Sequence, residues 1–412
     1  MSDAPAVDAA RVIADLRELD RLTGGPGGAR RVAWGPEWSE ARSFLKGLLG
    51  EIGLEAETDE AGNLWSYLEG DAAPALALGS HLDSVPQGGW LDGPLGVMAA
   101  LGVLRAWAAS GQPPPRTLAL VDWADEEGAF GRSLLGSSAA SGSLDPDEVA
   151  SLQDAVGRNA EDVLAASKVK LGEIGRASSR LDRLAALLEL HIEQGPVLEA
   201  EGIPIAAVSG TVGIERWRFS FEGEASHAGT TPMDARHDAG RAAAGLMMVV
   251  AAIGEIRSGV ATTGSVRFEP GTPTVIPGRA EIVVDLRNAA AEELAGMLLE
   301  LREAAQRCAQ DNGCEVSAEL IWRIAPTEFD PELVALARQS CEAVAGTDRV
   351  LVSGALHDAA EAARRIPVAM LFVRSIGGVS HSPAEDSSDA DLELAIRAYA
   401  DLAGRALLQP LA

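Results

Sequence analysis

Residues 74–93 read PALALGSHLDSVPQGGWLDG, an apolar run that passes directly into a loop rich in glycine and proline. The run at 75–78 is typical of a short buried strand in a parallel sheet. The loop that follows carries His81, Asp83 and Asp92. Imidazole and carboxylate groups are the ligands that zinc, manganese, cobalt and nickel ions accept. The stretch therefore predicts a strand of an α/β sheet with a metal site at its carboxyl end.

Three further apolar runs also precede residues that can bind metal. These are 118–121 followed by Glu126 and Glu127, 187–190 followed by His191, and 367–373 followed by His381. Open α/β sheets place their sites where the carboxyl ends of the strands meet. We therefore expect these side chains to converge on the loop that carries His81.

The acidic residues of these loops differ in the chemistry that they offer. Asp92 can place one carboxylate oxygen on each of two metal ions, although Asp-Gly is also a common turn. Asp83 lies two residues beyond His81 and can accept the second imidazole N–H. Glu126 and Glu127 repel each other, so burying both requires a nearby cation. The alternative interpretation is that they are acidic residues at a helix N-terminus, where the helix dipole favours them. At a strand end they point in different directions, which lets Glu127 bind metal while Glu126 acts as a general base.

Composition limits the class of protein. The chain has 412 residues, of which 47% are hydrophobic, and this length favours two domains. A net charge of −27 argues against nucleic acid or an anionic membrane as partners. No signal peptide is evident, and no uninterrupted apolar segment reaches the roughly 18–20 residues of a membrane span. Three cysteines without metal-finger spacing indicate a reduced, cytoplasmic protein.

The pattern of helices and strands changes near residue 210. Residues 1–209 and 325–412 alternate helix and strand, as α/β domains do. Between them, strands are predicted at 214–221, 264–269, 280–286 and 315–322, and helices at 234–256 and 290–312. That order is the β-α-β-β-α-β unit of ferredoxin-like folds. The sequence thus predicts a discontinuous domain, 1–209 and 325–412, interrupted by a smaller domain at 210–324.

Longer motifs extend these patterns. They are GSHLDSVPQGGWLDGPLGV at 79–97, HIEQGPVLE at 191–199, SHAGTTPMDARHDA at 226–239, VIPG at 275–278 with DLR at 285–287, and SHSPAE at 380–385. On these motifs, and from about residue 11 to the end, the chain resembles the dinuclear-metal amidohydrolases of the hydantoinase/carbamoylase type. This family includes N-carbamoyl-L-amino acid hydrolases, allantoate amidohydrolases and β-ureidopropionases, and is related to aminoacylase and dipeptidase metallopeptidases. The resemblance implies a zinc-peptidase-like catalytic domain with a mixed sheet and an inserted ferredoxin-like lid and dimerisation domain.

The resemblance also implies residue roles. Two divalent ions per subunit (zinc, manganese, cobalt or nickel) would be held by His81 and His191, by the bridging Asp92, and by Glu127 and His381. Glu126 would be the general base. The substrate contacts implied are His227 from the partner subunit on the reacting carbonyl, Arg287 on the carboxylate, and Gln194 on the ureido group, with His357 and Thr274 close by.

The function that we expect is metal-dependent hydrolysis of an N-carbamoyl-L-amino acid to amino acid, ammonia and carbon dioxide, in a homodimer formed through the inserted domain. Three departures from the family pattern affect the substrate: Thr274 replaces an asparagine, Leu356 replaces a glycine, and the segment after Glu127 lacks an arginine. Allantoate, β-ureidopropionate, N-acyl amino acids and dipeptides remain alternative substrates. A non-catalytic metal-dependent binding module is the alternative of another class, and the intact Glu126 argues against it.

Overall fold

The computed structural model describes residues 4–410, which divide into two compact units. The main unit contains the chain up to Ser209 and again from Glu328, and the inserted unit is Gly210–Thr327. The chain therefore leaves the main unit once and returns to it.

The main unit is built on a mixed sheet. Its strands within residues 4–410 are, side by side, β1 (Ala56–Thr58), β2 (Leu64–Leu68), β4 (Leu118–Trp123), β3 (Ala75–His81), β5 (Leu184–Ile192), β15 (Val368–Val373), β6 (Ile205–Thr211) and β13 (Thr327–Glu328), with β14 (Val350–Ser353) paired to β6. Strands β4, β3, β5 and β15 run parallel to one another. Every residue of these four strands is buried, which explains why they read as continuous apolar runs.

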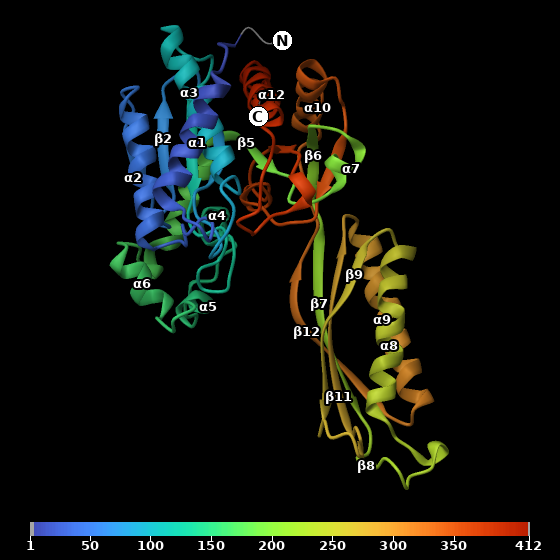
Figure 1. Cartoon of the computed structure of the whole chain (residues 1–412). Coiled ribbons are helices and arrows are strands. Elements are labelled where there is room, and N and C mark those ends of the chain that lie inside the picture. The colour runs from blue at the N-terminus through green and yellow to red at the C-terminus, as the bar shows by residue number, and fades with distance from the viewer. Residues whose placement is uncertain (1–3, 411–412) are drawn as a thin grey trace. The chain divides into compact units, whose positions relative to one another are not determined.

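Helices pack on both faces of this sheet (Figure 1). One face carries α1 (Ala9–Thr23), α2 (Pro36–Gly50), α3 (Pro94–Ser110), α10 (Pro331–Ala345) and α12 (Asp389–Leu407). The other face carries α4 (Leu135–Ser141), η1 (Leu171–Arg183), α7 (Val197–Glu201) and α11 (Asp358–Ala362). Leu76 and Leu78 point into the first core and Ala75 and Ala77 into the second, because successive side chains of a strand face opposite sides. Short helices α5 (Pro146–Ala150), α6 (Ala160–Ala166) and η3 (Ile376–Gly378) lie outside these layers.

The inserted unit is a four-stranded antiparallel sheet with two helices on one face. Its elements are β7 (Gly213–Glu222), β8 (Ser226–His227), η2 (Met233–Ala235), α8 (Ala239–Ile256), β9 (Val260–Glu269), β10 (Val275–Ile276), β11 (Arg279–Asn288), α9 (Ala291–Asp311) and β12 (Glu315–Ile324). The strand order β12-β7-β11-β9 is that of a ferredoxin-like unit. Trp217, Phe219 and Phe221 alternate along β7 and pack under the helices. The predicted fold class, a mixed sheet with a separate inserted α+β domain, is confirmed.

The first helix of the inserted unit begins later than predicted. The sequence suggests a helix from residue 234, but α8 begins at Ala239. The Asp238 carboxylate accepts the N–H of Arg241 at 3.0 Å and so caps the helix there. Within the described residues α8 is the one helix long and apolar enough to cross a membrane by length and composition, although Arg241 and Glu255 interrupt it. Its side chains Leu246, Val250 and Ile253 lie in the core of the inserted unit, which accounts for the apolar face that packs there.

Candidate metal centre

The predicted ligands of the main unit converge at one edge of its sheet. His81 ends β3 and His191 lies near the end of β5, while Glu126 and Glu127 follow β4. The strands β4, β3 and β5 are adjacent and parallel, so their carboxyl ends meet. His381 joins them from the loop after η3. The structure therefore brings together side chains that lie up to 300 positions apart, from His81 to His381.

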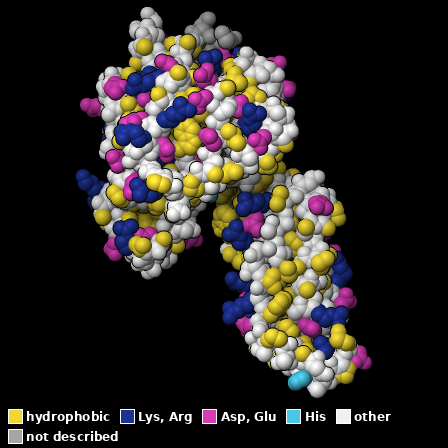
Figure 2. Space-filling model, in the orientation of Figure 1, with side chains coloured by type: hydrophobic (Ala, Val, Ile, Leu, Met, Phe, Trp, Pro, Cys, Tyr) yellow, Lys and Arg dark blue, Asp and Glu magenta, His cyan; other side chains and the backbone are white. Residues whose placement is uncertain are grey.

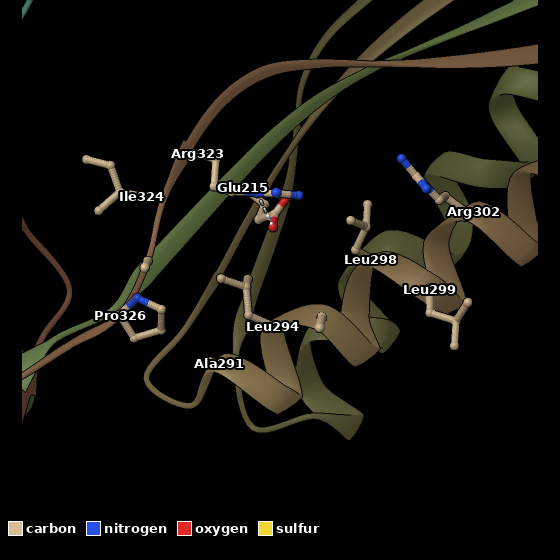
Figure 3. Close-up of a pocket in the computed structure, with 11 residues that line it drawn as sticks. Glu215, Ala291, Leu294, Leu298, Leu299, Arg302, Arg323, Ile324 and Pro326 are labelled. Carbon is tan, nitrogen blue, oxygen red and sulfur yellow. Dashed lines mark hydrogen bonds and ion pairs between the residues drawn. The ribbon is translucent and has the colours of Figure 1, made fainter. Parts of the chain in front are cut away.

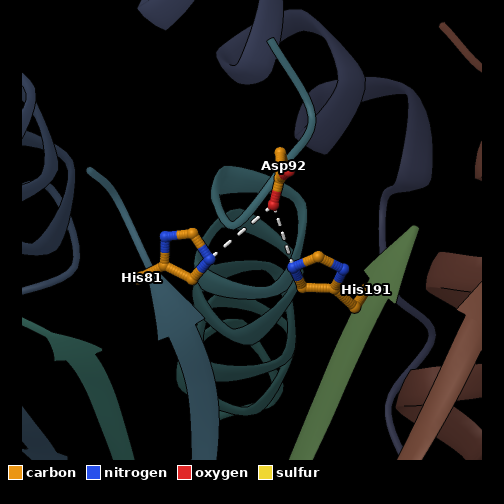
Figure 4. A group of neighbouring side chains, drawn as sticks. All are labelled: His81, Asp92 and His191. Atoms are coloured by element: carbon orange, nitrogen blue, oxygen red, sulfur yellow. Dashed lines mark ion pairs between the residues drawn. The ribbon is translucent and has the colours of Figure 1, made fainter. Parts of the chain in front are cut away.

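Asp92 lies at the centre of this group, and Figure 4 shows its carboxylate between His81 and His191. Its Oδ1 atom is 3.2 Å from His191 Nε2 and 3.8 Å from His81 Nε2. Its Oδ2 atom is 3.4 Å from His381 Nε2, and that nitrogen is 3.3 Å from Glu127 Oε2. Each oxygen of one carboxylate thus faces a different set of side chains, which is the arrangement a carboxylate shared between two cations requires.

Backbone carbonyls orient the two buried histidines. His81 Nδ1 lies 3.2 Å from the Asp83 carbonyl, and His191 Nδ1 lies 2.9 Å from the Ile192 carbonyl. A carbonyl oxygen only accepts, so each Nδ1 carries the proton and each Nε2 faces Asp92. The nearest Asp83 carboxylate oxygen is 3.6 Å from the His81 ring nitrogen. That carboxylate accepts the N–H groups of Glu126 and Glu127 at 3.3 and 3.0 Å, so Asp83 positions both sides of the site.

The buried charges of this group demand cations. Burial raises the pKa of Glu126 well above its usual range, and the neighbouring Glu127 carboxylate raises it further. Burial opposes protonation of His81, but Glu126 and Asp83 outweigh it and raise the pKa of this imidazole. Burial likewise acts against ionisation of Asp92, yet the surrounding histidines lower its pKa. In a metal-free protein, protons on His81 and His191 provide positive charge beside these carboxylates.

The same side chains fit divalent metal ions. Three groups have donor atoms within 4.8 Å of one another: His81, Asp92 and His191; Asp92, Glu127 and His381; and Glu189, His191 and His357. Within residues 4–410, His191 Nε2 is buried and faces Asp92 Oδ1 at 3.2 Å without good hydrogen-bond geometry. A buried ring nitrogen left in this way, beside carboxylate oxygens, is suited to a metal ion.

Glu189 and His357 lie behind His191. The Glu189 carboxylate accepts the Ser80 hydroxyl at 2.7 Å and the Ala359 N–H at 3.1 Å, and burial raises its pKa. His357 stacks edge-on against His191, with ring centroids 4.5 Å apart, and burial lowers its pKa well below the usual range. Sequence reasoning placed His357 near the site but missed Glu189. Its position two residues before His191, on the same face of β5, could have indicated it.

Gln194 contacts the centre directly. Its Nε2 atom donates to Asp92 Oδ2 at 2.9 Å and to Ser380 Oγ at 3.2 Å. Both Gln194 and His381 have left-handed backbone conformations, with φ of 57° and 52°, which cost on the order of 1–3 kcal/mol each. The amide of Gln194 therefore holds Asp92, and its predicted contact with a ureido group stays a prediction.

The other predicted substrate contacts belong to the inserted unit. His227 lies on β8, opposite Val275 of β10, and its Nδ1 accepts the Gly229 N–H at 3.0 Å. The Thr274 carbonyl accepts the Ala228 N–H at 2.9 Å. Arg287 lies near the end of β11, where its Nε donates to Asp285 at 2.9 Å. The roles of His227, Thr274 and Arg287 toward a substrate stay predictions.

The inserted unit also has a cavity of about 450 Å³ between α9 and the end of β12 (Figure 3). Its walls include Leu294, Leu298 and Ile324, and the Glu215–Arg323 ion pair (2.7 Å) lies at one side. None of the predicted site residues lines it. The cluster around Asp92 is therefore the candidate centre.

Comparisons with known proteins agree with this geometry. The model of peptidase family M20/M25/M40 matches residues 77–405. The chain is 35% identical over 382 residues to the N-carbamoyl-L-amino acid amidohydrolase of Geobacillus stearothermophilus, covering 91% of this chain and 93% of that one. It is 35% identical over 380 residues to the allantoate amidohydrolase of Escherichia coli K12, covering 91% and 92%. The crystal structure of a hydantoinase/carbamoylase family amidase from Burkholderia ambifaria superposes with a TM-score of 0.86 at 34% identity, covering 98% of each chain.

Metal should stabilise this protein against unfolding. At a free zinc or manganese concentration of about a hundred times Kd, the gain is about 3 kcal/mol, because the ion binds the folded state. Thermal unfolding of chelator-stripped protein, with and without added metal, measures it. Asp92→Asn should lose most of the gain, since it removes the carboxylate common to two of the three ligand groups. The control Glu40→Gln changes an exposed carboxylate and should keep the full metal-induced stabilisation. If Asp92→Asn also kept it, the metal would bind elsewhere.

Proposed function

Because this chain belongs to peptidase family M20/M25/M40, and within it to the amidohydrolases of the hydantoinase/carbamoylase type, we propose that it hydrolyses an N-carbamoyl-L-amino acid. The chain is thus a hydrolase that acts on C–N bonds, which leaves no support for a non-catalytic binding module. The observation that carries the proposal is the Asp92 carboxylate between two ligand groups, with Glu126 beside it.

Allantoate is the second candidate substrate. It carries the same ureido group, and the relative named for it is as similar to this chain as the N-carbamoyl-L-amino acid amidohydrolase is, at 35% identity. β-Ureidopropionate, N-acyl amino acids and dipeptides need the same bond-breaking machinery and differ in the groups that flank the bond. We propose the N-carbamoyl-L-amino acid first because its single carboxylate and single ureido group match the one arginine and one glutamine predicted to contact substrate, Arg287 and Gln194.

Glu126 is the proposed general base. Its Oε2 atom lies 3.8 Å from His81 Nε2, and only 7% of the residue is exposed. Bound metal ions would lower the pKa of a water molecule and polarise the ureido carbonyl. Glu126 takes a proton from the attacking water and returns it to the amino nitrogen as the C–N bond breaks. The carbamate released then yields ammonia and carbon dioxide.

The protein is proposed to act as a homodimer through the inserted unit. His227 follows β7 beyond the Arg279 end of β11, whereas Arg287 lies near the other end, and the strand rises by about 27 Å from Arg279 to Arg287. One small ureido acid cannot touch both residues of the same chain, so His227 is proposed to reach the substrate of the partner. Hydrophobic side chains lie on the surface of the inserted unit (Figure 2), among them Met248 of α8 and Val260 of the edge strand β9. Such a surface suits a second copy.

The substrate is tested by ammonia release. Chelator-stripped protein is loaded with zinc, manganese, cobalt or nickel and offered N-carbamoyl-L-amino acids, allantoate, β-ureidopropionate, N-acyl amino acids and dipeptides. We expect metal-dependent ammonia from an N-carbamoyl-L-amino acid. Ammonia from allantoate alone would select the second candidate. No ammonia from any ureido compound, together with cleavage of N-acyl or dipeptide substrates, would show that the protein is not a carbamoylase.

Substitutions of Glu126 and Glu127 should have different effects on activity and metal content. Glu126→Gln should lower kcat by about 10²–10⁴-fold without changing metal content, because it removes a base and keeps a similar shape. Glu127→Gln should lower metal content as well as activity, since Glu127 lies in a ligand group. Metal analysis beside ammonia release distinguishes the two. Wild-type turnover in Glu126→Gln would assign the base to another group.

The shared site is tested by complementation. Co-expressed Glu126→Gln and His227→Ala chains, each with its own tag, form a mixed dimer in which one site has both residues intact. Random pairing should restore about a quarter of wild-type activity, whereas each variant alone stays inactive. No recovery in a purified mixed dimer would place His227 in the site of its own chain.

A further inference from the structure

The loop that carries the candidate ligands has little regular structure of its own. It runs from Leu82 to Asp92, between β3 and α3, and most of it is buried. Buried N–H and carbonyl groups must be hydrogen-bonded, and here neither a helix nor a strand provides the partners. Asp122 accepts the Leu82 N–H and Glu127 the Val85 N–H, and two further charged side chains, from more distant parts of the chain, bind the rest of the loop.

Arg31 binds carbonyls at both ends of the loop. Its side chain is fully buried, with Nε donating to the Leu82 carbonyl at 2.9 Å and Nη2 to the Gly89 carbonyl at 3.3 Å. Nη1 donates to Thr23 Oγ1 at 3.4 Å. Asp20, Glu385, Asp83 and Asp92 are near enough to favour its charge, but its direct contacts along the loop are backbone oxygens. A buried charge is retained only where such partners compensate for lost hydration.

The backbone beside Arg31 follows the same loop. Ala29 and Gly88 exchange two hydrogen bonds, of 2.8 and 3.1 Å. The Ser84 N–H donates to the Arg31 carbonyl at 3.0 Å, and the Arg31 N–H donates to Ser84 Oγ at 3.1 Å. Residues 29–31 therefore run along the loop and fix where the guanidinium enters it.

Glu385 binds N–H groups at the end of the loop. Its Oε1 atom accepts the N–H groups of Leu91 and Asp92 at 3.1 and 3.0 Å, and 2% of the residue is exposed. Its Oε2 lies 3.0 Å from Ser380 Oγ, which is also 3.0 Å from Asp92 Oδ2. A Cβ atom added at Gly89 would lie 2.0 Å from this carboxyl group, so the contact requires a glycine there. Glu385 thus holds the backbone at Asp92, while the single hydroxyl proton of Ser380 is donated either to Glu385 or to the Asp92 side chain.

We propose that Arg31 and Glu385 are positioning residues that hold the 82–92 loop from two sides, the guanidinium on its carbonyls and the carboxylate on its N–H groups. Together they fix the Asp92 carboxylate between the histidines. This inference rests on the proposed function, because the position of Asp92 matters only if it binds metal for hydrolysis. Neither residue contacts substrate.

Hydrogen exchange of the metal-free protein tests the proposal without metal or substrate. The amides of Leu91 and Asp92 should exchange about ten- to hundredfold faster in Glu385→Ala than in the wild type. Arg31→Met should speed exchange across 82–92. The matched control is Arg116→Gln, which removes a guanidinium contact to the Pro74 carbonyl (2.7 Å) at the other end of β3. It should leave this segment unchanged.

Metal affinity, measured by competition with a chromogenic chelator, gives the second readout. Arg31→Met and Glu385→Ala should each weaken zinc binding by about 10- to 100-fold, as loss of a group that orients ligands does. Glu385→Gln keeps an acceptor oxygen and should recover most of the affinity, and Arg31→Lys should recover part of it. If Arg31→Met and Glu385→Ala fail to fold, these two conservative variants are measured in their place. In all four variants, the fold decrease in kcat should exceed the fold increase in KM.

Either readout can overturn the proposal. Wild-type exchange at 82–92 in Arg31→Met and Glu385→Ala, or in the conservative pair where these do not fold, would show that the loop does not depend on them. An equal loss of zinc affinity in Arg116→Gln would reduce the effect to general destabilisation. If the wild type binds no metal and cleaves no ureido compound, the proposed function fails, while the exchange data still decide whether Arg31 and Glu385 hold the loop.

Discussion

The structure of the main unit depends on one electrostatic constraint, which is the burial of several carboxylates at a single sheet edge. Asp92, Glu126 and Glu127 lie together where solvent screens little, and their mutual repulsion is large at such a site. They can remain ionised together only where cations lie among them. His81 and His191 can meet this condition by holding protons, and all three histidines can meet it by binding metal ions beside the same carboxylates. The adjacent parallel strands β4, β3 and β5 make the arrangement possible, because they deliver ligands from separate loops to one place.

Much of the buried polar chemistry around the centre serves loop backbone. Asp122 accepts the Leu82 N–H at 2.8 Å and pairs with Arg42 at 2.7 Å, and Asp83 accepts the N–H groups of the two glutamates. The backbone N–H and carbonyl groups of a loop lack the regular partners that helices and strands provide, so side chains form hydrogen bonds with them instead. Preorganised ligands depend on such outer contacts, since a small displacement of the carboxylate changes its distance from each histidine.

Several features of the fold were predictable because the pattern of the sequence is local. The strands β3, β4, β5 and β15 are short apolar runs. Both faces of these strands are buried, and strands of this kind are apolar along their whole length. The order of elements in the inserted unit gave its ferredoxin-like sheet. The start of α8 was misplaced by five residues, because the Asp238 cap competes with helical propensity upstream. The side chains of the candidate centre could be named, since each follows such a strand or lies in a motif.

The sequence by itself determined the kinds of ligand, the strands that carry them and the family to which the chain belongs. Only the tertiary structure decided which Asp92 oxygen faces which histidine, and that Gln194 donates to Asp92. It also decided that Arg31 and Glu385 hold the loop between them. The physical reason is that these contacts join segments near residues 31, 90 and 385. Local propensity does not specify which distant group a loop N–H or carbonyl will meet; that follows from the packing of the whole sheet.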